Sequence, residues 1–161
     1  MSDRLIFHVD VNSAFLSWEA VDRLCNGETL DLRTVPSCVG GDPERRTSIV
    51  STKSIPAKKY GIVTGEPVSS ALRKCPNLVI AGSNFDWYVK CSRAFKAICQ
   101  AYTPTMQSFS IDEVFLDMSG MNLIYPDPIA TAYEIKDRVY KELGFTVNVG
   151  VASNKLCAKM A

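Results

Sequence analysis

The order of strand-like and helix-like segments is the feature of this sequence that most constrains its fold. An apolar run at Leu5–Val9 is typical of a strand covered on both faces. The second half of the chain then predicts helices and strands in the order αββαβ, followed by the start of another helix: Asn84–Tyr102, Met106–Ser110, Val114–Met118, Pro128–Leu143, Thr146–Val151 and Asn154–Ala161. The sequence therefore predicts an α+β fold with a ferredoxin-like βαββαβ sheet and helices on one face.

The segment between residues 12 and 80 interrupts this order. It predicts three strands and three helices: Leu32–Val39, Thr47–Ser51 and Leu78–Ala81, and Ser13–Cys25, Pro56–Tyr60 and Pro67–Lys74. We therefore expect an inserted, smaller α/β lobe. Because the chain stops inside its last helical pattern, we expect it to be a fragment of a longer protein.

Composition limits the class of protein. With 161 residues, 47% hydrophobic and 22% charged, the chain predicts one ordinary domain or two small ones, not a disordered segment. No apolar run approaches the roughly 20 residues that span a bilayer, and the N-terminus lacks a secretory pattern. Six scattered cysteines without a C-x-x-C pair, and one histidine, argue against a zinc site. We expect a cytoplasmic protein with free thiols and no membrane contact.

The charge is unevenly distributed. The net charge of +1 is uninformative, but the stretch from Glu44 to Tyr60 holds five basic residues and one acid. Such a stretch favours an anionic ligand met at one place, or it is an ordinary solvated surface. Both interpretations stay open on charge alone.

Three acids follow or separate predicted strands. Asp10 ends the first strand, and Asp112 and Glu113 lie in the connection between the strands predicted at Met106–Ser110 and Val114–Met118. If these strands are neighbours, three carboxylates meet at one edge, where a hard cation such as Mg²⁺ would neutralise them. The alternative is that each acid is an exposed turn residue.

Five segments carry a family resemblance when taken together and in order: Phe7–Phe15, Gly40–Arg46 with Ile49–Thr52, Lys58–Ile62, Ser110–Asp117 and Val149–Ala161. They resemble motifs of the Y-family DNA polymerases, the translesion enzymes, and most closely the bacterial UmuC-like and polymerase-IV-like branch. The resemblance covers essentially the whole chain. It implies a palm from residues 1–11 and 81–161 and fingers from residues 12–80. The thumb and little finger of the family would lie beyond residue 161.

The resemblance also implies a function and a mechanism. It implies template-directed transfer of a nucleotide from a deoxynucleoside triphosphate to a primer 3′-hydroxyl, in DNA damage tolerance, repair and the SOS response. The implied cofactor is a pair of Mg²⁺ ions, for which Mn²⁺ can substitute. The implied partners are primer–template DNA, deoxynucleoside triphosphates and, through the region beyond residue 161, a sliding clamp. The isolated fragment is expected to be inactive or very weak.

The resemblance assigns roles to eight residues. Asp10, Asp112 and Glu113 match the catalytic metal ligands, and Val11 would add its backbone carbonyl. The remaining four match nucleotide-binding positions: Phe15 as the steric gate under the sugar, and Thr52, Lys58 and Lys155 at the triphosphate. Read without the resemblance, Phe15 is a core aromatic residue and Lys155 an exposed lysine.

The sequence departs from the family pattern at the fingers. Where the family usually has Tyr followed three residues later by Arg, this chain has Ile55 and Lys58, which remove a hydroxyl donor and a bidentate guanidinium. Asn12 stands where an acid is often found. These departures leave open a second interpretation, a non-catalytic polymerase-like protein that binds DNA or a partner. A third, another palm-type enzyme such as a nucleotide cyclase, lacks the Gly40–Arg46 segment.

Overall fold

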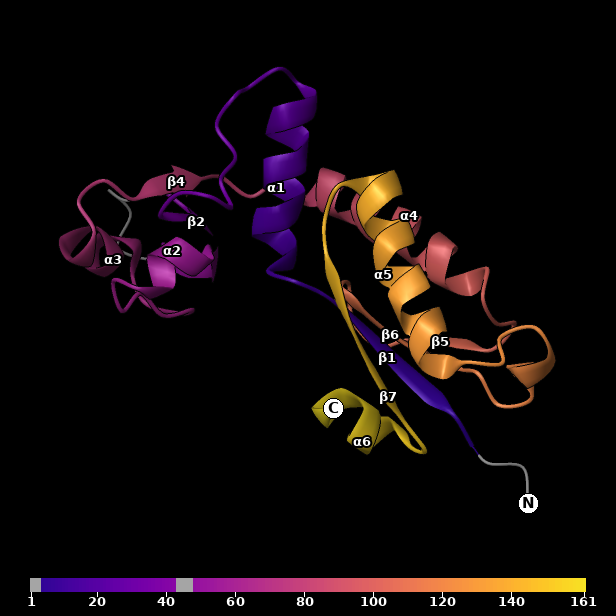
Figure 1. Ribbon diagram of the computed structural model, residues 1–161. Coiled ribbons are helices and arrows are strands. Elements are labelled where there is room, and N and C mark those ends of the chain that lie inside the picture. Colours follow the sequence, from indigo (N-terminus) through magenta and orange to yellow (C-terminus); the bar gives the residue numbers. More distant parts are fainter. Residues whose placement is uncertain (1–3, 43–47) are drawn as a thin grey trace. The chain divides into compact units, whose positions relative to one another are not determined.

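The computed structural model describes residues 4–42 and 48–161, and the chain forms two compact units (Figure 1). The first unit comprises Met1–Asn12 and Val89–Ala161, and the second comprises Ser13–Tyr88. The helix α4 (Phe85–Gln100) begins in the second unit and continues in the first.

The first unit is built on a four-stranded sheet in which every neighbouring pair is antiparallel. Its spatial order is β5 (Met106–Ser108), β6 (Glu113–Asp117), β1 (Ile6–Val11) and β7 (Val147–Ala152). The central strand β1 thus lies between two strands from the second half of the chain. This topology confirms the α+β, ferredoxin-like fold that the order of the segments predicts.

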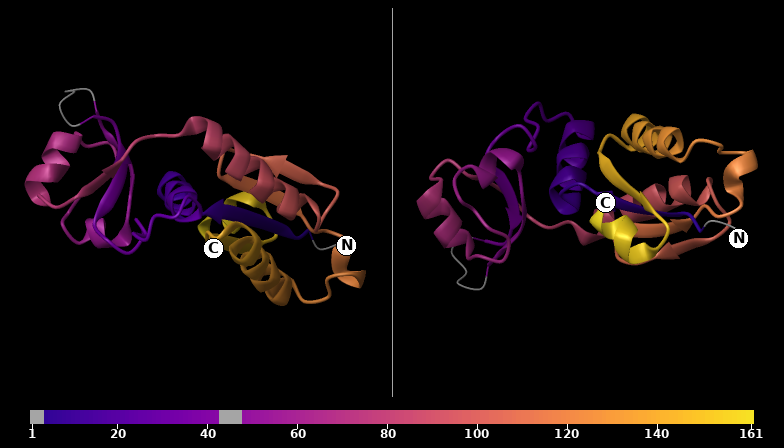
Figure 2. Two further views of the ribbon diagram at one scale, coloured as in Figure 1. Left: turned by 90° about the horizontal axis from the view of Figure 1, so that it is seen from above. Right: turned by 60° about the horizontal axis from the view of Figure 1, so that its bottom comes forward.

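The two faces of this sheet are covered by different helices. Phe7 and Val9 of β1 are fully buried on one face, and α4 and α5 (Pro128–Leu143) cover that side (Figure 2). The short helix α6 (Lys155–Met160) lies on the opposite face, where Ala158 packs against Ile6 and Phe115. A single 3₁₀ turn, η1 (Met121–Leu123), precedes α5.

The second unit contains a three-stranded sheet in the order β3 (Val50–Lys53), β2 (Ser37–Gly40) and β4 (Val79–Ala81). Strand β2 is antiparallel to β3 and parallel to β4. Because side chains alternate along a strand, consecutive residues of β2 enter two separate cores.

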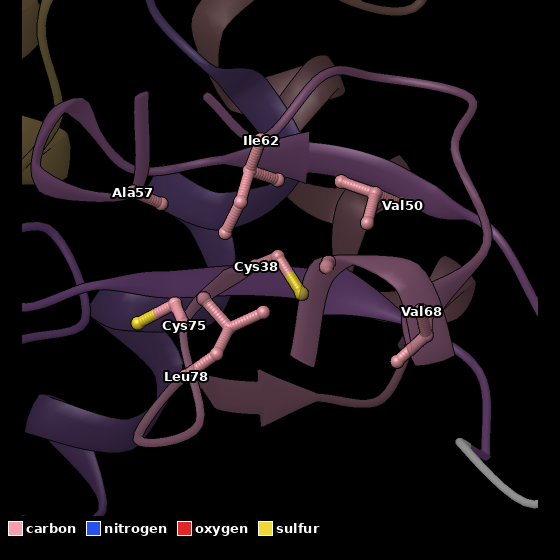
Figure 3. Packing of buried hydrophobic residues seen from close by; sticks show 8 residues of the cluster. Cys38, Val50, Ala57, Ile62, Val68, Cys75 and Leu78 are labelled. Carbon is pink, nitrogen blue, oxygen red and sulfur yellow. The ribbon is translucent and has the colours of Figure 1, made fainter. Parts of the chain in front are cut away.

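Helix α1 (Ala14–Cys25) forms the core on one face, where Leu16 and Ala20 pack against Val39. On the other face, Cys38 joins the apolar residues around α2 (Ile55–Lys58) and α3 (Val68–Lys74), as Figure 3 shows. Burial raises the pKa of the Cys38 thiol to about 11, so this cysteine serves as a packing residue.

The sequence pattern predicts the start of β2 too early in the chain. A strand at Leu32–Val39 was expected, but the strand begins at Ser37, and Leu32 lies in a turn. The Asp31 side chain accepts hydrogen bonds from the backbone and side chain of Arg33, and the N–H of Thr34 donates to the carbonyl of Asp31. These bonds close a turn that hydrophobicity alone does not reveal. Most of the expected turn at Gly40–Arg46 lies outside the described residues.

No helix in the described ranges has the length and apolar character needed to cross a bilayer.

Candidate active site

The end of β1 and the start of β6 bring the predicted acids together. Asp10 and Glu113 are direct cross-strand partners, so their side chains leave the same face of the sheet. The N–H of Val11 donates to the carbonyl of Asp112 at 3.0 Å, which fixes the turn before β6 beside the end of β1. The convergence of Asp10, Asp112 and Glu113 at one sheet edge therefore follows from the register of two strands.

Helix α4 holds the turn that carries Asp112. The ammonium of Lys96 donates to the carbonyl of Ser110 at 2.7 Å, and the Ser92 hydroxyl donates to the carbonyl of Ile111. The Ser110 hydroxyl in turn donates to Oδ1 of Asp112 at 2.6 Å. The position of the Asp112 carboxylate is thus set by hydrogen bonds that begin on α4.

One oxygen of Glu113 has two donors. Nε2 of His8 lies 2.8 Å from Oε2 of Glu113, and Nζ of Lys159 lies 2.5 Å from the same oxygen. His8 is buried in β1, two residues before Asp10 and on the same face. The Lys159 ammonium also lies 4.5 Å above the ring of Phe109.

The acids differ in their protonation equilibria. Burial, reinforced by the charges of Glu113 and Asp112, raises the pKa of Asp10. Burial acts in the same direction on Glu113, but hydrogen bonds from Lys159 and His8 outweigh it and lower the pKa of that carboxyl. The negative charge of Glu113 is therefore stabilised by its basic neighbours, whereas the negative charge of Asp10 is destabilised by burial and by the neighbouring acids.

The donor set fits a hard divalent cation. The three carboxylates are the kind of oxygen ligand that Mg²⁺ prefers, and the repulsion at Asp10 is what such a cation relieves. The carbonyl of Val11 is expected from the resemblance to be a further ligand. Within the described residues, however, no three acidic, histidine or cysteine side chains are gathered closely enough to form a ready-made metal site. The contacts of Glu113 with His8 and Lys159 show where its carboxylate is held instead.

A polar cavity of about 300 Å³ opens beside Asp10. Its lining includes Asn148, which pairs with Asp10 across β1 and β7, and the basic residues Lys136 and Lys159. Asp10 is therefore accessible from this side.

Phe15, the expected steric gate, lies in an aromatic cluster of the second unit. Its ring stacks on Tyr88 at 4.9 Å between centroids and contacts Trp18 and Phe85 at 6.0 and 5.7 Å. Two residues earlier, Ser13 has a left-handed backbone, with φ 46° and ψ 53°. Such a conformation is uncommon outside glycine and is found more often at functional sites.

The other nucleotide-binding candidates lie on exposed or half-buried positions. Thr52 pairs with Val39 on the α1 face of its sheet, and Lys58 is exposed on α2. Lys155 is exposed at the start of α6, where it donates to Oε1 of Gln107 and lies 5.7 Å from the ring of Phe115. Thr52 and Lys58 belong to the second unit, and Lys155 to the first.

Sequence reasoning missed two residues of this site, His8 and Lys159. His8 looked like part of an apolar strand, although its spacing of two from Asp10 places both side chains on one face. Lys159 stands four residues after Lys155, so the helical repeat places both lysines on one side of α6.

Known proteins match almost the whole chain. The model of the impB/mucB/samB family (IMS) matches residues 9–161. DNA polymerase IV of Clostridium acetobutylicum is 51% identical over 158 residues, which are 98% of this chain and 40% of that protein. DNA polymerase IV of Acetivibrio thermocellus is 40% identical over 157 residues, which are 98% of this chain and 38% of that protein. This chain thus spans about two fifths of the length of these relatives.

Solved structures share the fold. DinB from Sulfolobus solfataricus superposes with a TM-score of 0.82 at 24% identity, over 97% of this chain and 44% of that one. An insertion ternary complex of Dbh DNA polymerase superposes with a TM-score of 0.81 at 25% identity, again over 97% and 44%.

Proposed function

Because this chain belongs to the impB/mucB/samB family, we propose that it is the palm and fingers of a translesion DNA polymerase. The reaction would be template-directed transfer of a nucleotide from a deoxynucleoside triphosphate to a primer 3′-hydroxyl. The observation that carries the proposal is the pairing of Asp10 with Glu113 beside Asp112 at one sheet edge. The names of the relatives, DNA polymerase IV, support it.

The assignment of the parts follows the resemblance. Residues 1–11 and 81–161 would be the palm and residues 12–80 the fingers. The compact units support a division near these points, but residues 81–88 group with the second unit. The reason is local: Tyr88 stacks on Phe15, and the indole N–H of Trp87 donates to the carbonyl of Trp18.

Each site residue would have one task. Asp10, Asp112, Glu113 and the carbonyl of Val11 would hold two Mg²⁺ ions, which Mn²⁺ can replace. When bound, such ions supply the positive charge that stabilises an attacking hydroxyl and a leaving pyrophosphate.

The nucleotide-binding residues would orient the substrate. The ring of Phe15, held by its aromatic neighbours, would lie under the sugar and exclude a ribose 2′-hydroxyl. Thr52, Lys58 and Lys155 would bind the triphosphate, the two lysines by charge.

The partners would be primer–template DNA and deoxynucleoside triphosphates, with a sliding clamp bound elsewhere in the longer protein. An insertion ternary complex of the similar Dbh DNA polymerase supports the first two. The setting would be DNA damage tolerance in the bacterial cytoplasm, as part of the SOS response.

A chimera tests the activity. Residues 1–161 would replace the matching region of the Clostridium acetobutylicum polymerase IV, to which they are 51% identical. We expect Mg²⁺-dependent primer extension by the chimera, and no extension by the same chimera with Asp112→Ala or Glu113→Ala. Circular dichroism controls for folding, because both side chains lie at a sheet edge and not in the core.

The departures at Ile55 and Lys58 favour one alternative, a polymerase-like protein that binds DNA without catalysis. A folded chimera that binds primer–template DNA but does not extend it would establish that alternative. Extension that survives both alanine substitutions would contradict the assigned residues.

A further inference from the structure

Helix α6 is held closely over the sheet face that carries the acids. Ala158 is buried against Ile6 and Phe115, and Gly150 of β7 lies in contact with the carbonyl of Ala158. A helix so short is not stable alone, so its position depends on this packing. The packing fixes the side of α6 from which Lys155 and Lys159 extend.

These two lysines have different partners. Lys159 lies 2.5 Å from the carboxylate of Glu113, whereas Lys155 donates to the neutral amide of Gln107. Both ammonium groups also approach an aromatic ring, Phe109 and Phe115 respectively. Of these two lysines, Lys159 is therefore the one that pairs with a predicted metal ligand.

The Lys159 contact blocks one oxygen of that ligand. A carboxylate oxygen has two lone pairs in its plane, and Oε2 of Glu113 already accepts from His8 at 2.8 Å and from Lys159 at 2.5 Å. With both donors in place, Oε2 has no lone pair left for a cation. A cation could use this oxygen only after one donor leaves, and Lys159 is the more exposed of the two, with 43% of its side chain accessible against 7% for His8.

We propose that Lys159 is a positioning residue that competes with the divalent cation for Glu113. In the cation-free protein its ammonium supplies the positive charge at this carboxylate, and a cation that binds Oε2 of Glu113 displaces the ammonium. Lys159 thereby sets the cation affinity of the edge and keeps Glu113 in one orientation until a cation arrives. This inference rests on the proposed function, because it takes Glu113 to be a cation ligand.

The proposal predicts a change in affinity of definite sign. Lys159→Gln removes the competing charge and its repulsion of an incoming cation, so the affinity for cation should rise. Partly exposed ion pairs contribute little free energy, so we expect the affinity for the cation to increase by about two- to fivefold. Lys159→Arg retains the charge and a donor, and should bind cation as the wild type does.

Binding of Mn²⁺ to the 161-residue chain, without DNA or nucleotide, measures this affinity. The free ion is followed by electron paramagnetic resonance, and circular dichroism checks that each variant is folded. Lys155→Gln is the matched control, since it removes the same charge from the same helix but not from a carboxylate. Glu113→Gln tests whether Glu113 ligates the ion at all.

The outcomes separate the inference from the proposed function. Tighter binding by Lys159→Gln, with unchanged binding by Lys155→Gln and weaker binding by Glu113→Gln, supports the proposal. Unchanged or weaker binding by Lys159→Gln, with binding still lost in Glu113→Gln, overturns the competition and leaves the metal site intact. Binding unaffected by Glu113→Gln overturns both. An equal increase in both lysine variants indicates general charge repulsion and also overturns the competition.

Discussion

A β-carbon at Gly150 would collide with the backbone carbonyl of Ala158, so β7 and α6 approach each other backbone to backbone. The missing side chain lets α6 lie close enough for Ala158 to be buried at 1% exposure and for Lys159 to reach Glu113. One glycine on the edge strand thus connects the packing of a short helix to the charge at the candidate active site.

Gly150→Ala should therefore displace α6. The new methyl group would collide with the backbone carbonyl of Ala158, which cannot move aside as a flexible side chain can. We therefore expect the free energy of unfolding, measured by urea denaturation, to fall by about 1–3 kcal/mol. Gly82→Ala is the control, since a β-carbon there meets nothing within 4 Å and its φ is not in the left-handed region. Equal effects of the two substitutions would contradict the close packing of α6.

Asp10→Asn should raise the stability of the cation-free protein at neutral pH. The raised pKa of Asp10 means that the folded state binds the proton more tightly than the unfolded state. The free energy of unfolding therefore falls as the pH rises from about 3.8, the pKa of the unfolded state, through the higher pKa of the folded state. Asparagine at position 10 carries no charge, so the variant does not undergo this decrease. Since solvent screens part of the repulsion, the gain should be on the order of 0.5 kcal/mol.

Urea denaturation in EDTA at pH 4 and pH 7 measures the effect of Asp10→Asn. The stabilisation should be present at pH 7 and smaller at pH 4. Asp137→Asn on the exposed side of α5 is the matched control and should change little at either pH. A variant that is less stable than the wild type at pH 7 would show that the charge on Asp10 is favourable in the cation-free fold.

The order of the strands and the proximity of Asp10 to Asp112 and Glu113 could be predicted, because both depend on local sequence patterns. Apolar runs and helical repeats locate β1, α4, β6 and α5 to within a few residues, and the acid at the end of β1 is visible in the sequence. Glu113 was expected in the connection before β6 but is the first residue of that strand. The five motifs correctly indicated the family, whose model matches residues 9–161.

The contacts of Glu113 could not be predicted in the same way. The approach of His8 depends on the register between β1 and β6, and that of Lys159 on how α6 packs over the sheet. The late start of β2 depends on the hydrogen bonds of Asp31, which apolar periodicity does not report. The contacts of Glu113 and the start of β2 arise from three-dimensional contacts, whereas patterns along the sequence predict individual helices and strands.

Phe15→Leu should weaken discrimination against ribonucleotides in the polymerase chimera. Leucine keeps an apolar side chain but removes the flat ring that is held against Tyr88. If Phe15 is the proposed steric gate, a ribose 2′-hydroxyl would then meet a smaller obstacle. The ratio of kcat/KM for deoxynucleotide to that for ribonucleotide should fall by at least about tenfold, which corresponds to roughly 1.4 kcal/mol. Single-nucleotide incorporation with both substrates measures it.

Phe85→Leu provides the control for Phe15→Leu. Phe85 belongs to the same aromatic cluster and contacts both Phe15 and Tyr88, but 60% of its surface is exposed. We expect Phe85→Leu to lower the free energy of unfolding about as much as Phe15→Leu does. We expect its discrimination between deoxynucleotide and ribonucleotide to stay near the wild-type value. If both variants lose discrimination equally, the cluster acts as a whole and Phe15 has no separate role as a gate.

Ile55→Tyr combined with Lys58→Arg should lower the KM for deoxynucleotide in the chimera. Both side chains are exposed on α2, so the larger residues need not disturb a core. Pro56 lies in the first turn of this helix, where a missing N–H is tolerated, and Ser54 accepts a hydrogen bond from the N–H of Ala57. Proline is therefore compatible with a helical path for these positions.

A phenol and a guanidinium would add hydrogen bonds to the triphosphate, each worth about 1–3 kcal/mol when one partner is charged. We expect KM to fall by at least about tenfold in steady-state kinetics at constant Mg²⁺. Ile55→Phe with Lys58→Arg is the matched control, because it supplies the ring and the guanidinium without the hydroxyl, and should recover only part of the effect. An unchanged or raised KM in the tyrosine variant would mean that α2 does not face the triphosphate, and the proposed roles of Thr52 and Lys58 would then lose their basis.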